Sequence, residues 1–270
     1  MTITTARTGY ASVNDLQIYY EIHGAGAQPL ILLHGAYMTI DSAFSQLLPA
    51  LAADRQVIAV ELQGHGRTAD IDRPLSYEQM ADDVAALMRE LAIERADIFG
   101  YSMGAGVALQ LAVRHPERVR KLVAASVTYN SQGMHPEFLP MLEMITPETF
   151  AGSPMEAEYL RLAPDPGAFP TLVAKLTQLD HQIQDWPADD MRAINAPTLL
   201  IVGDSDVVRP EHAVELFRLL GGGVPGDLVG LPKSQLAMLP GVTHVMVIEQ
   251  TDLLLAMIRP FLDAPMPAAS

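Results

Sequence analysis

The pattern Gly100-Tyr101-Ser102-Met103-Gly104 is the stretch of the sequence whose residue types and spacing best suit chemistry. It stands after a short apolar run and before a helical pattern. A strand that turns abruptly into a helix holds its central residue in a strained conformation, with the side chain pointing outward. Cβ atoms two residues to either side would collide, so both positions favour glycine. The first N–H groups of the helix place partial positive charge beside the serine. The pattern predicts Ser102 as a nucleophile, although so short a motif also occurs by chance.

A serine nucleophile needs a base, and the base needs an orienting acid. His244 is the candidate base, because it follows a short apolar run at 236–239 and precedes the last helical pattern. The acid is expected after the apolar run 198–202, where Gly203-Asp204-Ser205-Asp206 offers two carboxylates. Either aspartate gives the chain order serine, acid, histidine of one hydrolase architecture.

Acyl transfer also needs hydrogen-bond donors for the negative charge that develops on oxygen. The backbone N–H of Met103 is one expected donor of this oxyanion hole. The second is expected from the loop after the apolar run 29–33, where Ala36 N–H is the first choice and Tyr37 N–H the alternative. His34 in the same loop is interpreted as a structural residue, and His212 as a solvated or capping residue on a helix.

The composition narrows the classes of function. The chain of 270 residues carries 17 basic and 32 acidic side chains, for a formal net charge of −15. This charge would repel phosphate backbones, so nucleic acid is not an expected partner. The absence of cysteine excludes disulfides, thiol nucleophiles and cysteine-bound zinc. No histidine pair has the H-E-x-x-H spacing of a metal site, so neither a metal nor another cofactor is expected.

No segment of the sequence indicates a membrane protein. Apolar runs such as 253–258 fall far short of the ~18 residues needed to span a bilayer. Residues 1–10 are polar and lack the apolar core of a secretory signal. We therefore expect a soluble, cytoplasmic protein that has no membrane partner and acts on a small acyl substrate. A homodimer is left open as its assembly.

The segments that must position the chemistry alternate between strand-like and helical patterns. Short apolar runs suit parallel strands buried on both faces, and they occur at 17–23, 29–33, 56–60, 96–99, 121–127 and 198–202. Helical patterns occur at 104–115, 210–220 and 250–262, and another follows the predicted cap at Ser76. The alternation predicts an α/β fold with a doubly wound, mostly parallel sheet flanked by helices.

Residues 128–197 interrupt this alternation with repeated prolines and many methionine and aromatic side chains, and without a strand-like run. We interpret them as an inserted helical cap, with residues 1–127 and 198–270 forming the core. Most of the cap's large apolar side chains are expected to fill its own interior, and some to face what it covers. The glycine-rich stretch 221–227 has no functional interpretation.

Five motifs occur in an order that resembles the α/β-hydrolase fold superfamily, specifically its small bacterial esterase-like members with a helical cap. They are His34-Gly35, Gly64-His65-Gly66-Arg67, the pentapeptide around Ser102, Gly203-x-x-Asp206 and Gly241-x-x-His244. Relatives usually place the acid three residues after the glycine, so the resemblance favours Asp206 over Asp204. It implies a triad of Ser102, Asp206 and His244.

These features predict a serine hydrolase that cleaves an ester or related acyl bond of a small, mainly apolar substrate through an acyl-enzyme. The serine at position 102 argues against dehalogenase and epoxide-hydrolase relatives, which use aspartate at the centre of this pentapeptide. Carbon–carbon bond hydrolysis, lactone hydrolysis, perhydrolysis and acyl transfer stay open on the same triad. A non-catalytic ligand-binding member of the fold is the alternative from another class.

Overall fold

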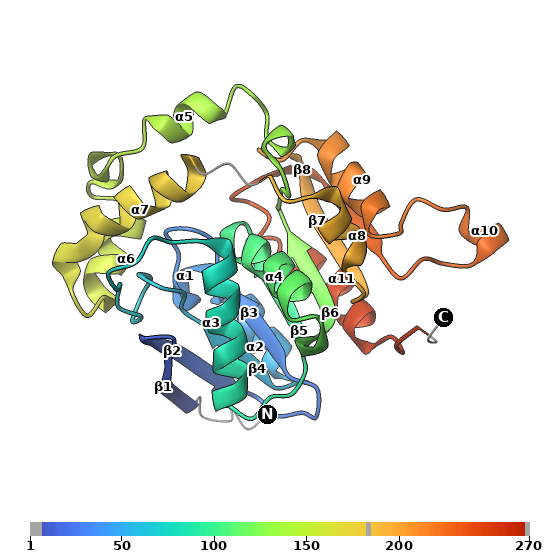
Figure 1. Cartoon of the computed structure of the whole chain (residues 1–270), viewed down its shortest axis with the longest axis horizontal. Coiled ribbons are helices and arrows are strands. Elements are labelled where there is room, and N and C mark those ends of the chain that lie inside the picture. Colours follow the sequence, from blue (N-terminus) through green and yellow to red (C-terminus); the bar gives the residue numbers. More distant parts are fainter. Residues whose placement is uncertain (1–6, 182–184, 268–270) are drawn as a thin grey trace.

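The computed structural model describes residues 7–181 and 185–267, and one sheet of eight strands runs through them (Figure 1). The strands are β1 (Arg7–Val13), β2 (Leu16–His23), β3 (Leu30–Leu33), β4 (Val57–Val60), β5 (Ala96–Tyr101), β6 (Val119–Ala125), β7 (Thr198–Ser205) and β8 (Gln235–Thr243). They lie in the order β1-β2-β4-β3-β5-β6-β7-β8. β2 pairs antiparallel with β1 and with β4, and all the later pairings are parallel. The predicted mostly parallel α/β sheet is confirmed.

Strand β1 has no counterpart among the strands predicted from sequence. Only Ala11 and Val13 of its seven residues are buried, because it lies at the edge of the sheet and pairs only with β2. A strand that buries so few side chains carries almost no hydrophobic alternation, and this alternation is the signal that sequence analysis depends on.

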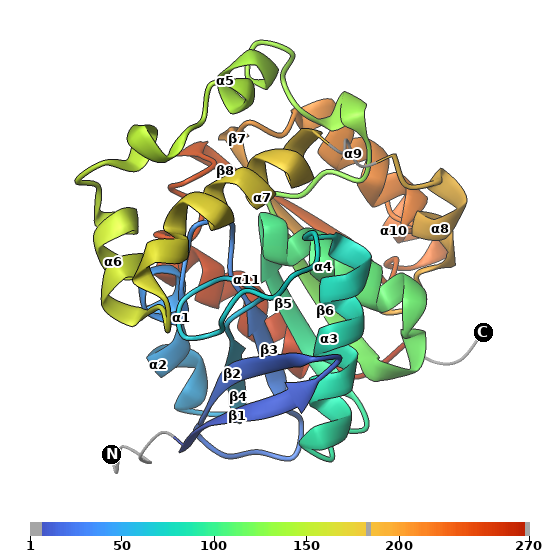
Figure 2. The same cartoon turned by 60° about the vertical axis from the view of Figure 1, so that its left-hand side comes forward.

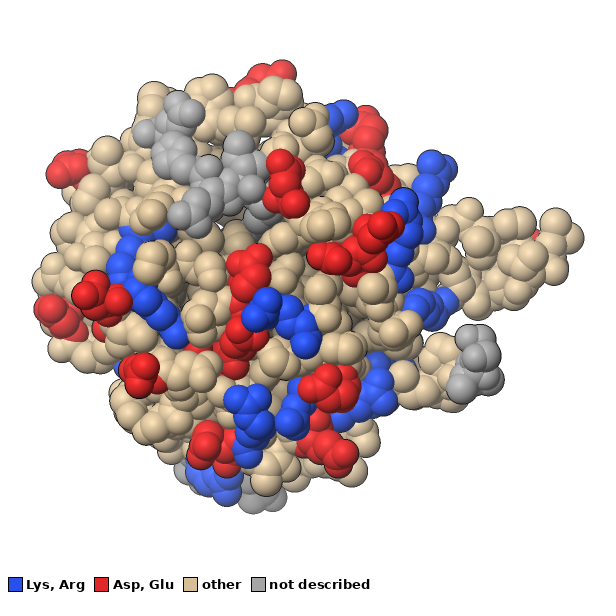
Figure 3. Space-filling view, in the orientation of Figure 1, with Lys and Arg blue, Asp and Glu red and all other residues tan. Residues whose placement is uncertain are grey.

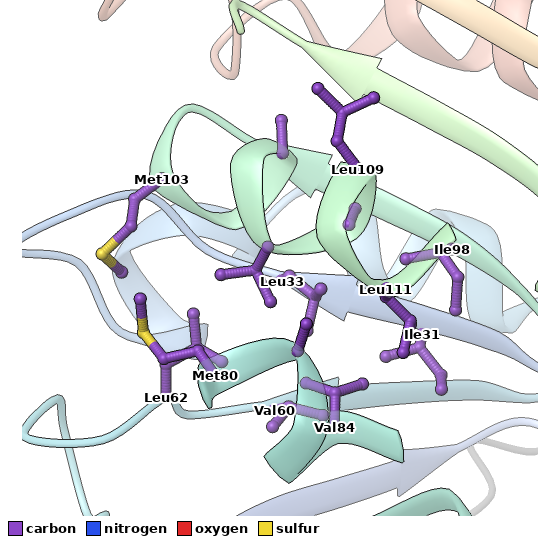
Figure 4. Packing of buried hydrophobic residues seen from close by; sticks show 14 of the residues in the cluster. Ile31, Leu33, Val60, Leu62, Met80, Val84, Ile98, Met103, Leu109 and Leu111 are labelled. Carbon is purple, nitrogen blue, oxygen red and sulfur yellow. The ribbon is translucent and has the colours of Figure 1, made fainter. Parts of the chain in front are cut away.

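Helices cover both faces of the sheet, as a doubly wound fold requires. One face carries α1 (Ile40–Phe44), α2 (Leu47–Ala52) and α11 (Thr251–Asp263), and the other carries α3 (Tyr77–Glu90), α4 (Met103–Arg114), α8 (Ala188–Ala193) and α9 (Pro210–Leu219). Successive residues of β3 point to opposite faces. Ile31 and Leu33 belong to the cluster that also contains side chains of α3 and α4 (Figure 4), and Leu30 and Leu32 pack on the other side.

The predicted helix ends agree with the structure to within one residue for α4, α9 and α11. Helix α3 begins after Ser76, whose hydroxyl oxygen accepts a 3.1 Å hydrogen bond from the N–H of Gln79 as predicted. None of the helices within residues 7–181 and 185–267 is long and apolar enough to cross a membrane.

The connection between β6 and β7 forms a helical layer of its own. It contains α5 (Leu139–Glu143), α6 (Pro154–Leu162) and α7 (Phe169–His181) before it returns to the core at α8. In Figure 2 these three helices lie together above α1 and the start of α4. Aromatic rings join the layer internally, because Phe169 contacts both Phe150 and Tyr159.

The connection between α9 and β8 forms an arm that projects from the core and ends in α10 (Gly226–Val229) (Figure 1). Its apolar side chains face solvent, with Leu228 83% and Leu231 92% exposed. On the face shown in Figure 3, acidic and basic side chains are interspersed over the core, and the arm is nearly free of charge.

Two buried histidines hold the loop that joins β3 to α1. His34 Nδ1 donates to the carbonyl of Gly35 at 2.8 Å, and its Nε2 accepts the N–H of Leu62 at 3.1 Å. His65 Nδ1 donates to a backbone carbonyl, and its Nε2 accepts the N–H of Tyr37 at 3.3 Å. Since each Nε2 accepts from a backbone N–H, both rings are neutral with the proton on Nδ1. Burial lowers the pKa of His34 to about 3 and that of His65 to about 4.

Glycines permit the close approach of α4 to the strands beside it. A Cβ at Gly104 would lie 2.2 Å from the carbonyl oxygen of Leu33 at the end of β3. A Cβ at Gly100 would lie 2.3 Å from the carbonyl oxygen of Gly104 itself. The two outer glycines of the pentapeptide are thus required by backbone packing, as the sequence analysis predicts.

Replacing Gly104 by alanine is expected to lower the free energy of unfolding by about 2 to 3 kcal/mol, because the clash is with backbone that cannot rotate away. Urea denaturation measures the change. Gly152→Ala is the control, since a Cβ added there would have no atom within 4 Å and only the positive φ of 71° opposes the change. Its free energy of unfolding should fall by about 1 kcal/mol. Equal losses would show that α4 can move away from β3.

Acid is expected to destabilise the chain through His65. Its pKa is about 4 when folded and 6.5 in a model compound, so the unfolded chain binds the proton first and stability falls as pH drops through this window. His65→Gln should remove about 1.5 kcal/mol of the loss between pH 6.5 and 5. Urea denaturation at both pH values tests this, with the exposed His135→Gln as control. An identical pH dependence for His65→Gln and wild type would contradict a buried neutral ring.

Candidate active site

Ser102 lies at the sharp turn between β5 and α4. Its backbone has φ 52° and ψ −118°, a strained conformation that only surrounding structure can hold. The N–H of Ser102 donates to Ala125 on the neighbouring strand at 2.9 Å, and its carbonyl accepts from Ala105 at 2.9 Å and Gly106 at 3.1 Å. These bonds fix the turn on both sides. The predicted strand–turn–helix context of the serine is therefore present.

His244 stands beside Ser102, although 142 residues separate them in the chain. The distance from His244 Nε2 to Ser102 Oγ is 2.9 Å, which is a hydrogen bond. The ring is placed by Tyr101, whose hydroxyl donates to the carbonyl of His244 at 2.9 Å and whose own ring lies 5.5 Å away. Sequence analysis assigns Tyr101 no such contact, since nothing local to the pentapeptide indicates it.

The second nitrogen of His244 distinguishes the two candidate acids. Nδ1 lies 2.7 Å from Asp206 Oδ1, and the Asp206 side chain is 0% exposed. Asp204 is exposed and lies elsewhere, with its carboxylate accepting the N–H groups of Gly241 at 2.8 Å and Val242 at 3.4 Å. The structure thus brings Ser102, His244 and Asp206 together, and it leaves Asp204 to hold the strand that leads to His244.

Asp206 is kept ionised in a buried site by the hydrogen bonds that it accepts. Burial alone would raise its pKa, but bonds from His244, from the hydroxyl of Ser126 at 2.6 Å and from the N–H of Val208 at 3.1 Å outweigh it. The pKa of Asp206 therefore lies below its ordinary value. The sequence does not predict this role of Ser126, because a serine after β6 carries no carboxylate that would mark it as the acid, and its positive φ of 55° has no sequence signal.

The predicted oxyanion donors lie at the same place. Ala36, Ser102, Met103 and His244 all line one cavity. Because the N–H of Tyr37 already donates to His65, the geometry favours Ala36 over Tyr37 as the partner of Met103. Both expected donors are backbone groups beside the serine, and they stay predictions.

The cavity beside Ser102 has a volume of about 420 Å³ and a mainly apolar lining. The layer formed by α5, α6 and α7 contributes side chains to it, including Phe138, Leu142, Ile145, Phe150, Met155 and Leu176. Met141 and Met144 face solvent instead, while Met191 and Tyr159 are buried in the main core. The expected division of the large apolar side chains between interior and cavity holds only in part.

The prediction of His212 as a solvated or capping residue is wrong. Its ring is buried, stacks on Tyr129 at 4.8 Å and accepts the N–H of Tyr129 at 3.1 Å. Burial lowers its pKa to about 4. The helical position alone gives no sign of the loop that covers it. Within the described part of the chain, no three histidine or acidic side chains are arranged to hold a metal ion.

Known proteins resemble this chain over different lengths. The dihydrolipoyllysine-residue acetyltransferase component of an acetoin cleaving system from Cupriavidus necator is 38% identical over 117 residues. That match covers 43% of this chain and 31% of the relative, so the chain spans about a third of that protein. The 2-hydroxymuconate semialdehyde hydrolase of Pseudomonas sp. (strain CF600) is 30% identical over 210 residues, or 70% of this chain and 74% of the relative.

Solved structures and a family model extend the likeness. A meta-cleavage product hydrolase from Pseudomonas fluorescens IP01 superposes with a TM-score of 0.73 at 22% identity. The match covers 97% of this chain and 98% of the other, and at this identity it shows the fold alone. Residues 28–188, more than half of the chain, match the model of the alpha/beta hydrolase fold. From its sheet, its serine turn and this match, the chain belongs to the alpha/beta hydrolase fold family.

Proposed function

We propose that the protein is a serine hydrolase that cleaves an ester or related acyl bond. One observation carries the proposal: Ser102, His244 and Asp206 form a continuous hydrogen-bonded chain that opens into an apolar cavity of about 420 Å³. An activated serine beside a cavity of this kind suits attack on the carbonyl carbon of a small, mainly apolar substrate.

The proposed reaction follows from the roles that this geometry allows. Ser102 Oγ attacks the carbonyl while His244 Nε2 takes its proton, and Asp206 orients the ring and stabilises the imidazolium. The N–H groups of Met103 and Ala36 stabilise the oxyanion. His244 then returns the proton to the leaving group, and a water molecule activated by the same ring hydrolyses the acyl-enzyme.

The layer containing α5, α6 and α7 is proposed to act as a cap over this reaction. It supplies much of the apolar wall of the cavity, which would exclude water from the oxyanion and bind the substrate's hydrocarbon part. In this role residues 128–197 set the substrate range, while the core supplies the chemistry.

Carbon–carbon bond hydrolysis is the second candidate, because two of the similar proteins are a semialdehyde hydrolase and a meta-cleavage product hydrolase. The similar protein from Cupriavidus necator is an acetyltransferase component, and acyl transfer would use the same acyl-enzyme. Among the described residues that line the cavity there is no lysine or arginine. A substrate bearing a carboxylate would therefore lack a cationic partner there, which favours an ester that carries no carboxylate.

Hydrolysis of p-nitrophenyl butyrate tests the triad. Ser102→Ala and His244→Ala should each lower kcat/KM by roughly 10⁴-fold or more, because each removes a group that moves bonds or protons. Asp206→Asn should lower kcat/KM by about 10³-fold, since it disturbs the orientation of His244.

Asp204→Asn is the matched control, because it removes the other carboxylate of the segment 203–206. It loses hydrogen bonds to the strand before His244 and to the hydroxyl of the adjacent Ser205, so a fall in kcat/KM of no more than about tenfold is expected. Wild-type rates for Ser102→Ala, or equal losses for the two aspartate variants, would contradict the assignment.

A further inference from the structure

Among the described residues, the charged side chains that line the cavity are all acidic. Of the described residues that line it, Asp180 and Glu249 are acidic and none is a lysine or an arginine. The cavity otherwise consists mainly of apolar and aromatic groups. A fixed charge in such a low-dielectric wall acts more strongly on a ligand than one in water.

Asp180 lies at the end of α7, the helix that closes the cavity from the cap side. It is half-buried, and it precedes the last residue of the helix. Carbonyl groups at a helix C-terminus carry partial negative charge, so the helix end adds to the carboxylate. The charge of Asp180 acts on Tyr37, which also lines the cavity. Burial is the larger cause and this charge the smaller one of the two that raise the pKa of Tyr37 above its usual range.

Glu249 is the second acidic residue that lines the cavity. It is exposed and follows Ile248, which also lines the cavity close to His244 in sequence. Burial and then the charges of Asp206 and Glu249 raise the pKa of Tyr101 above its ordinary range. The charges of Asp180 and Glu249 therefore each act on a tyrosine that lines the cavity.

Aromatic rings line the same cavity as these charges. Tyr37 and Phe150 both line the cavity, and their ring centroids are 4.5 Å apart. Ring faces and carboxylates together attract organic cations, quaternary ammonium groups above all. The net charge of −15 on the whole chain would also raise the local concentration of a cationic substrate and lower that of an anionic one.

We propose that the site prefers esters that carry a quaternary ammonium group, which binds between the carboxylate of Asp180 and the rings of Tyr37 and Phe150. This inference rests on the proposed hydrolase function and specifies its substrate class. Asp180 is then a specificity-determining residue, because it attracts the cation without taking part in the bond-breaking step.

Isosteric ester pairs test the preference, since each pair differs only in nitrogen against carbon at one quaternary centre. Butyrylcholine and 3,3-dimethylbutyl butyrate place this centre in the leaving group. Ethyl 4-(trimethylammonio)butyrate and ethyl 5,5-dimethylhexanoate place it in the acyl group. In at least one pair, kcat/KM of the cationic ester should exceed that of the neutral ester by about tenfold.

Asp180→Asn should lower this ratio about fivefold or more, chiefly through KM. Because each variant is compared with itself on the two esters, any general loss of folded enzyme cancels from the ratio. Asp15→Asn is the matched control, since it removes the same charge from an exposed turn between β1 and β2. Its ratio should equal that of the wild type.

The outcomes separate the two proposals. If both neutral esters are hydrolysed at least as well as their cationic partners, the cation preference is wrong and the hydrolase proposal stands. An unchanged ratio in Asp180→Asn overturns the role of Asp180. If no ester is turned over faster by wild type than by Ser102→Ala, the hydrolase function itself is wrong.

Discussion

The close contact between the start of α4 and the ends of the neighbouring strands is the constraint on which the rest of the structure depends. Gly104 brings the helix so near to Leu33 that a single methyl group would not fit. That contact forces the chain to turn sharply at Ser102, whose φ of 52° is held by hydrogen bonds to the adjoining strand and helix. The strained turn points the serine toward a loop from the far end of the sequence.

The groups around this turn are fixed mainly by buried hydrogen bonds. His34 and His65 tie the β3–α1 loop to the segment after β4, and Ser126 with Val208 holds Asp206. Each of these polar groups is costly to bury alone and inexpensive to bury as a pair. The proposed donors and the proposed base are therefore held in place by the protein itself, which is the condition under which electrostatic stabilisation of an oxyanion is most effective.

The sequence predicts the core well because most of its strands are short, continuous apolar runs. The candidate site residues come after such runs, so their place at the edge of the sheet is predictable as well. It cannot choose between Asp204 and Asp206 from the residues alone, since both follow the apolar run 198–202 and only burial and the hydrogen bond to His244 separate them. The sequence does not predict strand β1, because only two of its side chains are buried and it therefore lacks a clear hydrophobic pattern. The place of Asp180 in the cavity is equally hidden, because helical periodicity within residues 128–197 says nothing about how that layer docks.

Covalent labelling tests the central claim, that the fold makes Ser102 a nucleophile. The intact folded protein is treated with a fluorophosphonate probe, and the adduct is located by mass spectrometry of its peptides. We predict a single label on Ser102. The Ser102→Ala variant should take up no label, and the rate of labelling should be much lower in His244→Ala. A folded wild-type protein that takes up no label, or takes it up at another serine, would contradict the account and favour a non-catalytic member of the fold.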